Sequence, residues 1–294
     1  MKSLRSMLLT LLLAGPVALA VLADPVPSSG AGATPAGPRP VVAGLDDYRL
    51  TFNEEFDKPL SIAGGTGWDG RGITRWICHT PYSGDFGDAW FSGPADGKGP
   101  DGKLLSPFSV AGGILTITAW QDPSRQNHWR SGLLSSVDTE GRGFSQAMGY
   151  WECRMKCPSG PGVWPAFWLS SVGGIKKGPS AEIDILEAYG VDMTVAHQNV
   201  HLWNTAHGLG EGHSTKTADL SADWHVFSCL IDDARIHFYI DANEVWNTPV
   251  FPEAKLPLYV MVDLALGGGW PIDKTPSPSR LLVDYVRVYA PRTP

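Results

Sequence analysis

The sequence of 294 residues has few charged side chains and no concentrated run of one charge. Charged residues make up 18% of the chain, against roughly 25% in an average domain. The formal net charge is −7, and the longest basic run is the pair Lys176-Lys177. A nucleic-acid surface needs clustered Lys and Arg to neutralise phosphates. The sequence therefore excludes binding to nucleic acid.

A helical period is also missing. From Leu45 onward no window of about a dozen residues repeats apolar side chains every three to four positions, and no repeat of about 20–50 residues points to a solenoid or propeller. Short alternating or β-branched runs recur instead between turn residues. The clearest runs span 50–56, 113–119, 149–157, 181–188, 196–203, 225–232, 235–240, 258–266 and 282–289. Nine or more strands without a helix predict an all-β sandwich or barrel.

Cysteine is scarce, with four residues at Cys78, Cys153, Cys157 and Cys229. Four thiols allow three pairings. Cys153 and Cys157 lie four positions apart on one predicted strand, which separates their Cα atoms too far for a disulfide bond. Either could pair with Cys78 or Cys229, and free buried thiols are the alternative. The sequence leaves the pairing open.

The beginning of the chain is typical of a secretory signal. Two basic residues precede the apolar run 7–14, and small residues after it offer cleavage sites. Gly15-Pro16 interrupts the apolar stretch and leaves it short of the roughly 20 residues that a membrane span needs. We expect a signal peptide at 1–23, a linker rich in Pro, Gly and Ala at 24–44, and a folded domain over 45–291. The protein is expected to be secreted, to the periplasm or the extracellular space.

Tryptophan, glycine and proline are abundant. Twelve Trp stand beside ten Phe and eight Tyr, with 34 Gly and 24 Pro. The Gly and Pro content favours turn-rich β architecture, and the Trp excess indicates a use for large flat side chains. Residues 64–101 combine many Gly with Trp68, Trp76 and Trp90 and show little alternation. We expect long functional loops there, which wall a cleft and select the polymer that fits.

The segment 181–188 carries three carboxylates in an otherwise strongly β-forming run. Alternation along a strand places Glu182 and Asp184 on one face. Strict alternation would then turn Glu187 into the core. A β-bulge at Ile185-Leu186 would bring Glu187 out beside the other two acids. Acids packed this closely raise the proton affinity of at least one of them, which yields a proton donor and a carboxylate able to attack.

Two tryptophans stand just upstream of the acids. Trp164 and Trp168 have matching parity in an extended segment, so both can face one cleft. Indole faces are good platforms for sugar rings, and two carboxyl groups about 5–5.5 Å apart are the requirement for retaining glycoside hydrolysis. The alternatives are an acidic edge strand that blocks aggregation, a calcium site, and tryptophans buried in the core.

The run Glu182-Ile183-Asp184-Ile185-Leu186-Glu187 resembles the Glu-x-Asp-x-x-Glu signature of family 16 glycoside hydrolases, in the bulged form of the laminarinase-like members. Further segments resemble that family in the same order: 131–136, 149–156, 162–168, 223–227 and 283–289. The resemblance covers residues 50–289. It implies a two-sheet antiparallel β-jelly roll sandwich, concanavalin A-like, whose concave sheet forms the substrate cleft.

The resemblance also implies roles for individual residues. Glu182 would be the nucleophile, Glu187 the general acid and then base, and Asp184 the group that tunes and orients Glu182. Substrate contacts are implied for Trp164, Trp168, Arg154, Glu152, His201 and Trp270. Strand parity gives Glu152 and Arg154 a shared polar face, which we interpret as the cleft face. Asp263 stands where many members have Asn, and Asp284 matches a position that joins a structural calcium site in many relatives.

The predicted function is a secreted retaining endo-β-glycosidase that hydrolyses a β-1,3- or mixed β-1,3/1,4-glucan. One alternative is an endo-glycanase for a bacterial exopolysaccharide or a galactan. Another is a lectin-like carbohydrate-binding module, which needs the Trp platforms but not opposed carboxylates. The expected partner is the polysaccharide, with no nucleic acid, no membrane after signal cleavage, and a monomeric chain. No metal or organic cofactor is expected to take part in catalysis.

Overall fold

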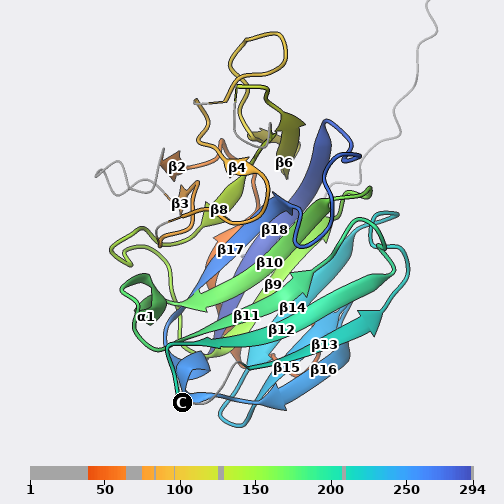
Figure 1. Cartoon of the computed structure of the whole chain (residues 1–294). Helices are drawn as coiled ribbons and strands as arrows, with labels where there is room; N and C mark the ends of the chain where they lie inside the picture. Colours follow the sequence, from red (N-terminus) through yellow and green to blue (C-terminus); the bar gives the residue numbers. More distant parts are fainter. Residues whose placement is uncertain are drawn as a thin grey trace, which may run out of the picture. The chain divides into compact units, whose positions relative to one another are not determined.

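A computed structural model describes residues 39–63, 75–82, 84–95, 97–124, 129–206 and 210–292. Most of these residues belong to two β-sheets that lie one over the other (Figure 1). The expected signal peptide at 1–23, most of the linker at 24–44, and Trp68 lie outside the described residues. Among the described residues, no helix has the length and apolar character needed to cross a membrane.

The first sheet has eight strands in the order β13-β12-β11-β10-β17-β8-β3-β2. Its strands are β13 (Gly210–Lys216), β12 (Val195–Trp203), β11 (Ser180–Glu187), β10 (Val163–Ser171), β17 (Leu258–Leu266), β8 (Leu133–Ser135), β3 (Trp76–Ile77) and β2 (Ile62–Ala63). All its pairs are antiparallel except the short pair of β2 with β3. The acidic segment is β11, near the middle of this sheet.

The second sheet has ten strands, with β16-β15-β14-β9-β18-β6-β7-β4 as its main path, β1 beside β18 and β5 beside β6. Its strands are β16 (Asn243–Pro249), β15 (Arg235–Ile240), β14 (His225–Ile231), β9 (Gly149–Lys156), β18 (Ser279–Pro291), β6 (Ile114–Gln121), β7 (Trp129–Ser131), β4 (Trp90–Phe91), β1 (Tyr48–Glu54) and β5 (Phe108–Ala111). Only β4 and β7 pair in parallel. Strand β9 lies between β14 and β18, in the sheet that does not contain the acids.

The expected two-sheet β-sandwich is confirmed, and each of the nine clearest runs forms a strand. The expectation of no helix is wrong in detail. A single α-helical turn, α1 (Val172–Ile175), follows β10, and a 3-10 turn, η2 (Pro252–Lys255), precedes β17. Both are four residues long, too short for the apolar period that marks a helix in sequence.

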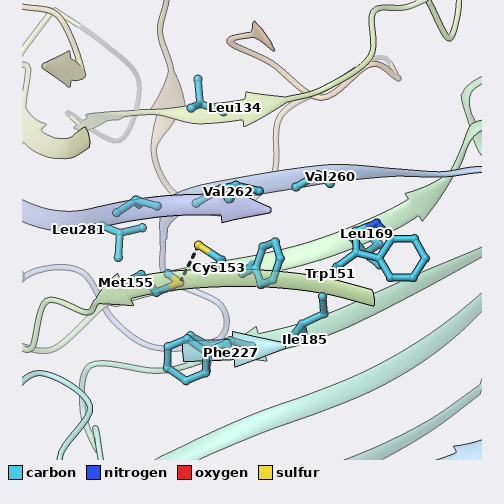
Figure 2. Close-up of a cluster of buried hydrophobic side chains, with 14 of the residues drawn as sticks. Leu134, Trp151, Cys153, Met155, Leu169, Ile185, Phe227, Val260, Val262 and Leu281 are labelled. Carbon is cyan, nitrogen blue, oxygen red and sulfur yellow. Dashed lines mark hydrogen bonds between the residues drawn. The ribbon is translucent and has the colours of Figure 1, made fainter. Parts of the chain in front are cut away.

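The core fills the space between the two sheets. Ile185 and Val262 from the eight-stranded sheet point toward Trp151, Phe227 and Leu281 from the ten-stranded sheet (Figure 2). These side chains have at most 1% of their surface exposed. Complete burial of one such side chain stabilises the fold by about 1.5–3 kcal/mol. The shared core gives the side chains on the outer face of the eight-stranded sheet a rigid support.

None of the four cysteines forms a disulfide bond, and all four are buried. Cys153 and Cys229 lie on adjacent strands of the ten-stranded sheet, and Cys153 Sγ is 3.9 Å from Met155 Sδ (Figure 2). Of the interpretations that the sequence leaves open, the structure supports buried thiols without disulfide bonds.

Candidate active site

The acidic strand contains the expected β-bulge. Asp184 pairs with Trp168 on β10, but Leu186 pairs with the next residue of β10, Phe167, so Ile185 is left as an extra residue. The pairing with β12 shifts at the same place. Ile185 and Leu186 are both buried in the core between the sheets. The bulge therefore turns two successive apolar side chains inward, and this turns Glu187 to the outer face.

Three rows of side chains cross the outer face of the eight-stranded sheet. The first row is Tyr259, Ser170, Glu182 and His201; the second is Met261, Trp168, Asp184 and Asn199; the third is Asp263, Ala166, Glu187 and His197. Each row takes its residues from β17, β10, β11 and β12. One acid of β11 stands in each row, so the three carboxyl groups form a line with a different set of neighbours for each.

A cavity of about 370 Å³ opens above these rows. Glu182, Asp184 and Glu187 line it together with Trp164 and Trp168. Its opposite wall is Tyr82, Gly84, Asp85 and Phe86, from the segment expected to form functional loops. The volume lies in the range of ligand pockets. The structure thus brings together the three acids and both upstream tryptophans, and it adds a loop wall to them.

Each acid has its own hydrogen-bond partners. Glu187 accepts hydrogen bonds from the indole N–H of Trp164 at 2.9 Å and the amide of Asn199 at 2.7 Å. His201 Nε2 lies 3.3 Å from Asp184 Oδ2. The indole of Trp203 donates a hydrogen bond to Glu182. These donors fix the carboxyl groups in place, and the position of His201 agrees with the expected cleft histidine.

Burial raises the proton affinity of all three acids. It raises the pKa of Glu182 to about 8 and that of Glu187 to about 7, and in both the Asp184 carboxyl adds to the effect. Burial also raises the pKa of Asp184, although hydrogen bonding to His201 opposes it. Interacting carboxyl groups titrate as a unit rather than one by one. The cluster therefore retains protons near neutral pH, which general acid catalysis requires.

Trp168 is held by a carboxyl group from the neighbouring strand. Its indole N–H donates to Asp263 Oδ1 at 2.7 Å, and Asp263 Oδ2 accepts from the backbone N–H of Ala265 at 3.1 Å. Asp263 is completely buried, and burial holds its pKa well above the usual range. With only 5% of its surface exposed, Trp168 presents an edge of its ring to the cavity, whereas Trp164 is more open.

The loop wall is braced from inside. His79 Nδ1 is 3.2 Å from Asp85 Oδ1, and Thr80 Oγ1 donates to the carbonyl groups of Tyr82 and Gly84. Phe86 then meets Trp164 and Trp168 edge to face, with centroids 5.5 and 5.7 Å apart. The expectation that this segment walls a cleft is confirmed for Tyr82, Gly84, Asp85 and Phe86.

The interpretation of Glu152 and Arg154 as cleft residues is wrong. Both lie on β9 in the ten-stranded sheet, and their neighbours Trp151 and Cys153 fill the core. Their side chains therefore point to the outer face of the other sheet, away from the acids. Alternation along β9 correctly predicted that Glu152 and Arg154 share a polar face. That face belongs to the ten-stranded sheet and does not line the cleft.

These two side chains have structural partners instead. Glu152 is completely buried and accepts hydrogen bonds from the backbone N–H of Val41 at 3.0 Å and from the hydroxyl of Tyr289 at 3.3 Å. Arg154 pairs with Asp284 and lies over the ring of Trp224. Arg154 thus engages one carboxylate oxygen of Asp284. The calcium interpretation of Asp284 stays a prediction, and no side-chain ligand set around Asp284 supports it among the described residues.

Not all of the remaining tryptophans lie at the cleft as expected. Trp76 is completely buried, packs against Phe52 and donates to Glu54, so it belongs to the core rather than to the cleft. Trp90 and Trp270 are 46% and 45% exposed. Trp270 follows β17 and is not among the residues that line the cavity, so its contact with substrate stays a prediction.

Several residues of the site were not predicted from the sequence. Asn199 and Trp203 on β12 touch the acids, and Tyr82 and Phe86 form the opposite wall. Parity along β12 puts Asn199 and Trp203 on the face of His201, so this signal was present in the sequence. No local pattern marks Tyr82 or Phe86, because a loop has no alternation.

One cluster of the described residues could hold a metal ion. Ligand atoms of Glu182, Asp184 and His201 all lie within 4.8 Å of one another. His201 and Asp184 are already in contact with each other, and Glu182 and Asp184 line the cavity. The acid network accounts for this cluster without a metal.

Comparison with known proteins yields a consistent set of relatives. The family model described as glycosyl hydrolases family 16 matches residues 116–287. An endo-1,3-1,4-beta-glycanase of Rhizobium meliloti (strain 1021) is 30% identical over 250 residues, which cover 82% of this chain and 51% of the relative. A beta-glucanase of Rhodothermus marinus is 31% identical over 201 residues, which cover 61% of this chain and 69% of the relative.

Solved structures agree on the fold. The catalytic domain of an endo-1,3-beta-glucanase (laminarinase) from Thermotoga petrophila RKU-1 superimposes with a TM-score of 0.65 at 21% identity, covering 84% of this chain and 99% of that domain. The chain spans about half the length of the two Rhizobium meliloti relatives, 51% of each. What it shares with them is the domain that carries the acidic strand.

Proposed function

Because the chain belongs to glycosyl hydrolases family 16, we propose that it cleaves internal bonds of a β-1,3- or mixed β-1,3/1,4-glucan. Relatives named as glycanase, beta-glucanase and laminarinase support this choice of substrate. The geometry of the site supports the proposal more strongly than the names of the relatives do. The observation on which it depends is the bulge, which brings Glu187 into one cavity with Glu182 and Asp184 beside Trp164.

The mechanism assigns one role to each acid. Glu187 protonates the glycosidic oxygen as the bond breaks, while Glu182 attacks the anomeric carbon and forms a covalent glycosyl-enzyme. Glu187 then takes a proton from a water molecule, which hydrolyses that intermediate with net retention of configuration. Asp184 stands between the two in the line of acids and couples to both, so it shifts their proton affinity and holds Glu182 in place.

The surroundings of Glu187 fit its role. Glu187 must change between acid and base, and its raised pKa of about 7 suits both steps. Trp164 donates to Glu187 and lines the cavity beside it, where an indole ring can pack against a sugar ring. The expected signal peptide would deliver the enzyme to a polysaccharide outside the cell.

The test is hydrolysis of laminarin and of mixed-linkage β-glucan, measured as new reducing ends. Glu182→Gln should abolish hydrolysis, because an amide cannot form the glycosyl-enzyme, while circular dichroism shows an intact fold. Glu140→Gln is the matched control, since Glu140 is exposed and bonds only Lys176 among the described residues. Proton NMR should show the β-anomer as the first product of the wild type.

Two results would count against the proposal. Unchanged turnover of Glu182→Gln would remove Glu182 from the mechanism, and an α-anomer as first product would exclude retention. Binding of laminarin by the wild type without any release of reducing ends would favour a lectin-like module instead.

A further inference from the structure

A second cavity adjoins the catalytic one. It has a volume of about 340 Å³ and shares Tyr82 and Glu182 with the catalytic cavity. Its other lining residues are Ser170, Gly174, Lys177, Ser180, Trp203 and Asn204. The two cavities meet at Tyr82 and Glu182, so a polymer chain that occupied both would pass Glu182. The second cavity is large enough to take a sugar unit next to the one that reacts.

Charge distinguishes the two cavities. Asp85, Glu182, Asp184 and Glu187 line the catalytic cavity, with no cationic side chain among its lining residues. Lys177 lines the second cavity and is the one cation among the lining residues of either. A cation placed beside acids commonly forms an ion pair with one of them. Lys177 is therefore available to a ligand only if no acid of the protein already binds its ammonium group.

The partners of Lys177 differ from those of its neighbour. Lys176 points to Glu140, with Nζ 3.0 Å from a carboxylate oxygen. Lys177 is exposed and forms no ion pair with any described residue. The ammonium group of Lys177 is therefore free to bind a group that enters the second cavity, whereas that of Lys176 is engaged.

The backbone at the mouth of this cavity is unusual. Lys177 has a φ of 60° and Asn204 a φ of 55°, the left-handed conformation that glycine adopts at no steric cost. Asn tolerates it well, but Lys does not. Left-handed residues other than glycine gather at functional sites, where the surrounding structure compensates for the strain. Lys177 follows the end of α1, and its N–H bonds to the carbonyl of Gly174, so the same conformation that ends this helical turn also places Lys177 at the cavity.

Trp203 gives this cavity an aromatic platform. Its ring is 46% exposed and stacks on His201 with centroids 5.7 Å apart at 26°. One face is thus supported and the other is open to a sugar ring. The platform, the Asn204 amide and the Lys177 ammonium group together offer stacking, a hydrogen bond and a positive charge.

We propose that the second cavity is a subsite for a sugar unit that carries a carboxylate, which Lys177 binds while the ring stacks on Trp203. The inference rests on the proposed function, because it names a preferred substrate for the same cleft. The preferred polymer is then a β-glucan-like chain with acidic units rather than a wholly neutral glucan.

The experiment compares mixed-linkage β-glucan with the same polymer in which a small fraction of the C6 hydroxyl groups has been oxidised to carboxylates. Rates of reducing-end release give the ratio of kcat/KM for the oxidised and neutral polymers. Mass spectrometry of the products locates the acidic unit relative to the cleaved bond. Lys177→Gln removes the charge, and Lys176→Gln is the matched control one residue away.

The wild type should cut the oxidised polymer in preference and place the acidic unit at a fixed distance from the new chain end. Lys177→Gln should lower the preference ratio about two- to fivefold, as expected for one exposed charged contact, and the acidic unit should no longer occupy a fixed position in the products. Lys176→Gln should keep both properties. Low salt should increase the wild-type preference, because exposed charges are screened by salt.

The inference and the proposed function fail in different ways. If neither polymer is cut by the wild type, the proposed function is wrong. If both are cut but Lys177→Gln lowers the two rates equally, Lys177 only neutralises Glu182 and the subsite is overturned. A random position of the acidic unit in wild-type products would overturn it as well.

Discussion

Burial of the catalytic carboxyl groups affects stability as well as catalysis. The pKa of Glu187 is about 7 in the folded protein, with burial as the main cause, and near 4.3 in an unfolded chain. Between these values the folded state binds more protons than the unfolded state. The free energy of unfolding must therefore fall as the pH rises from about 4.3 to about 7. The buried Glu187 carboxyl therefore lowers the stability of the folded protein near neutral pH.

Glu187→Gln removes this titration, so its melting temperature should rise relative to wild type as the pH goes from 4 to 8. Loss of one hydrogen bond from Trp164 or Asn199 lowers stability equally at every pH, so the slope against pH is the quantity to measure. Each kcal/mol shifts the melting temperature by about 2–4 °C in a domain of this size. Calorimetry across pH, with Glu140→Gln as the exposed control, supplies the comparison.

A constant difference between Glu187→Gln and wild type over this range would contradict the buried, proton-retaining Glu187. The same variant should lose about 10²–10⁴-fold in kcat, the usual contribution of a general acid. A protein that is more stable at pH 8 but inactive would show that the carboxyl is kept for function at a cost in stability.

At the scale of elements, the loop wall depends on a contact that does not touch substrate. Burial alone would lower the pKa of His79, but hydrogen bonds to Asp85 and Cys78 outweigh it and raise the pKa to about 10. His79 is therefore charged throughout the neutral range, and its contact with Asp85 weakens as the pH rises toward 10. The loop that carries Tyr82 and Phe86 is thus braced over the whole range in which the acids titrate.

Asp85→Ala should loosen this loop, because His79 loses its carboxylate and Phe86 loses its support. We expect kcat/KM to fall about tenfold, or about 1.4 kcal/mol, mainly through KM, with the shape of the pH profile unchanged. Asp85→Asn keeps an acceptor for His79 and should retain more activity. Asp101→Ala, an exposed residue of the same region paired with Lys103, is the control.

His79→Ala separates bracing from direct contact, since His79 does not line the cavity. It should reproduce most of the loss, and the double variant should not be additive. Full activity of His79→Ala would show that Asp85 acts on the substrate and not through the loop.

The elements also show how far the sequence could be interpreted. Alternation along 181–188 predicted the bulge and the face of each acid, because misplacing a charge in the core would be too costly. Alternation along β9 predicted that Glu152 and Arg154 share a face. It did not reveal which sheet β9 joins, because pairing with β14 and β18 depends on residues more than 70 positions away.

Other elements left no pattern to interpret. Strand β13 is polar and almost wholly exposed, so it lacks the apolar face that marks a strand. Trp76 lies in a two-residue strand beside a Gly-rich stretch and still packs in the core. The loop wall of Tyr82 and Phe86 is formed by tertiary contacts with β10, which no local pattern encodes.

At the scale of the whole molecule, the core between the two sheets contains all four cysteines. Burial raises the pKa of Cys153 and Cys229 well above its usual range and that of Cys157 to about 12. Thiols react and form disulfides as thiolates. Cys153 and Cys229 lie on adjacent strands of the sheet opposite the acids, and both side chains belong to the core between the layers. Figure 2 shows Cys153 in this core. The contribution of both cysteines is that of small apolar side chains.

The fold should therefore be indifferent to reducing agent. Addition of dithiothreitol should leave the melting temperature and the hydrolytic rate unchanged, because there is no bond to break. An aromatic disulfide reagent should find no reactive thiol in the native protein and four after denaturation. A disulfide that closes a long loop contributes about 2–4 kcal/mol, which would lower the melting temperature by several degrees on reduction. Such a fall, or rapid native labelling, would show that the thiols are not sealed between the sheets, and that the rigid support beneath the acids is less complete than its packing indicates.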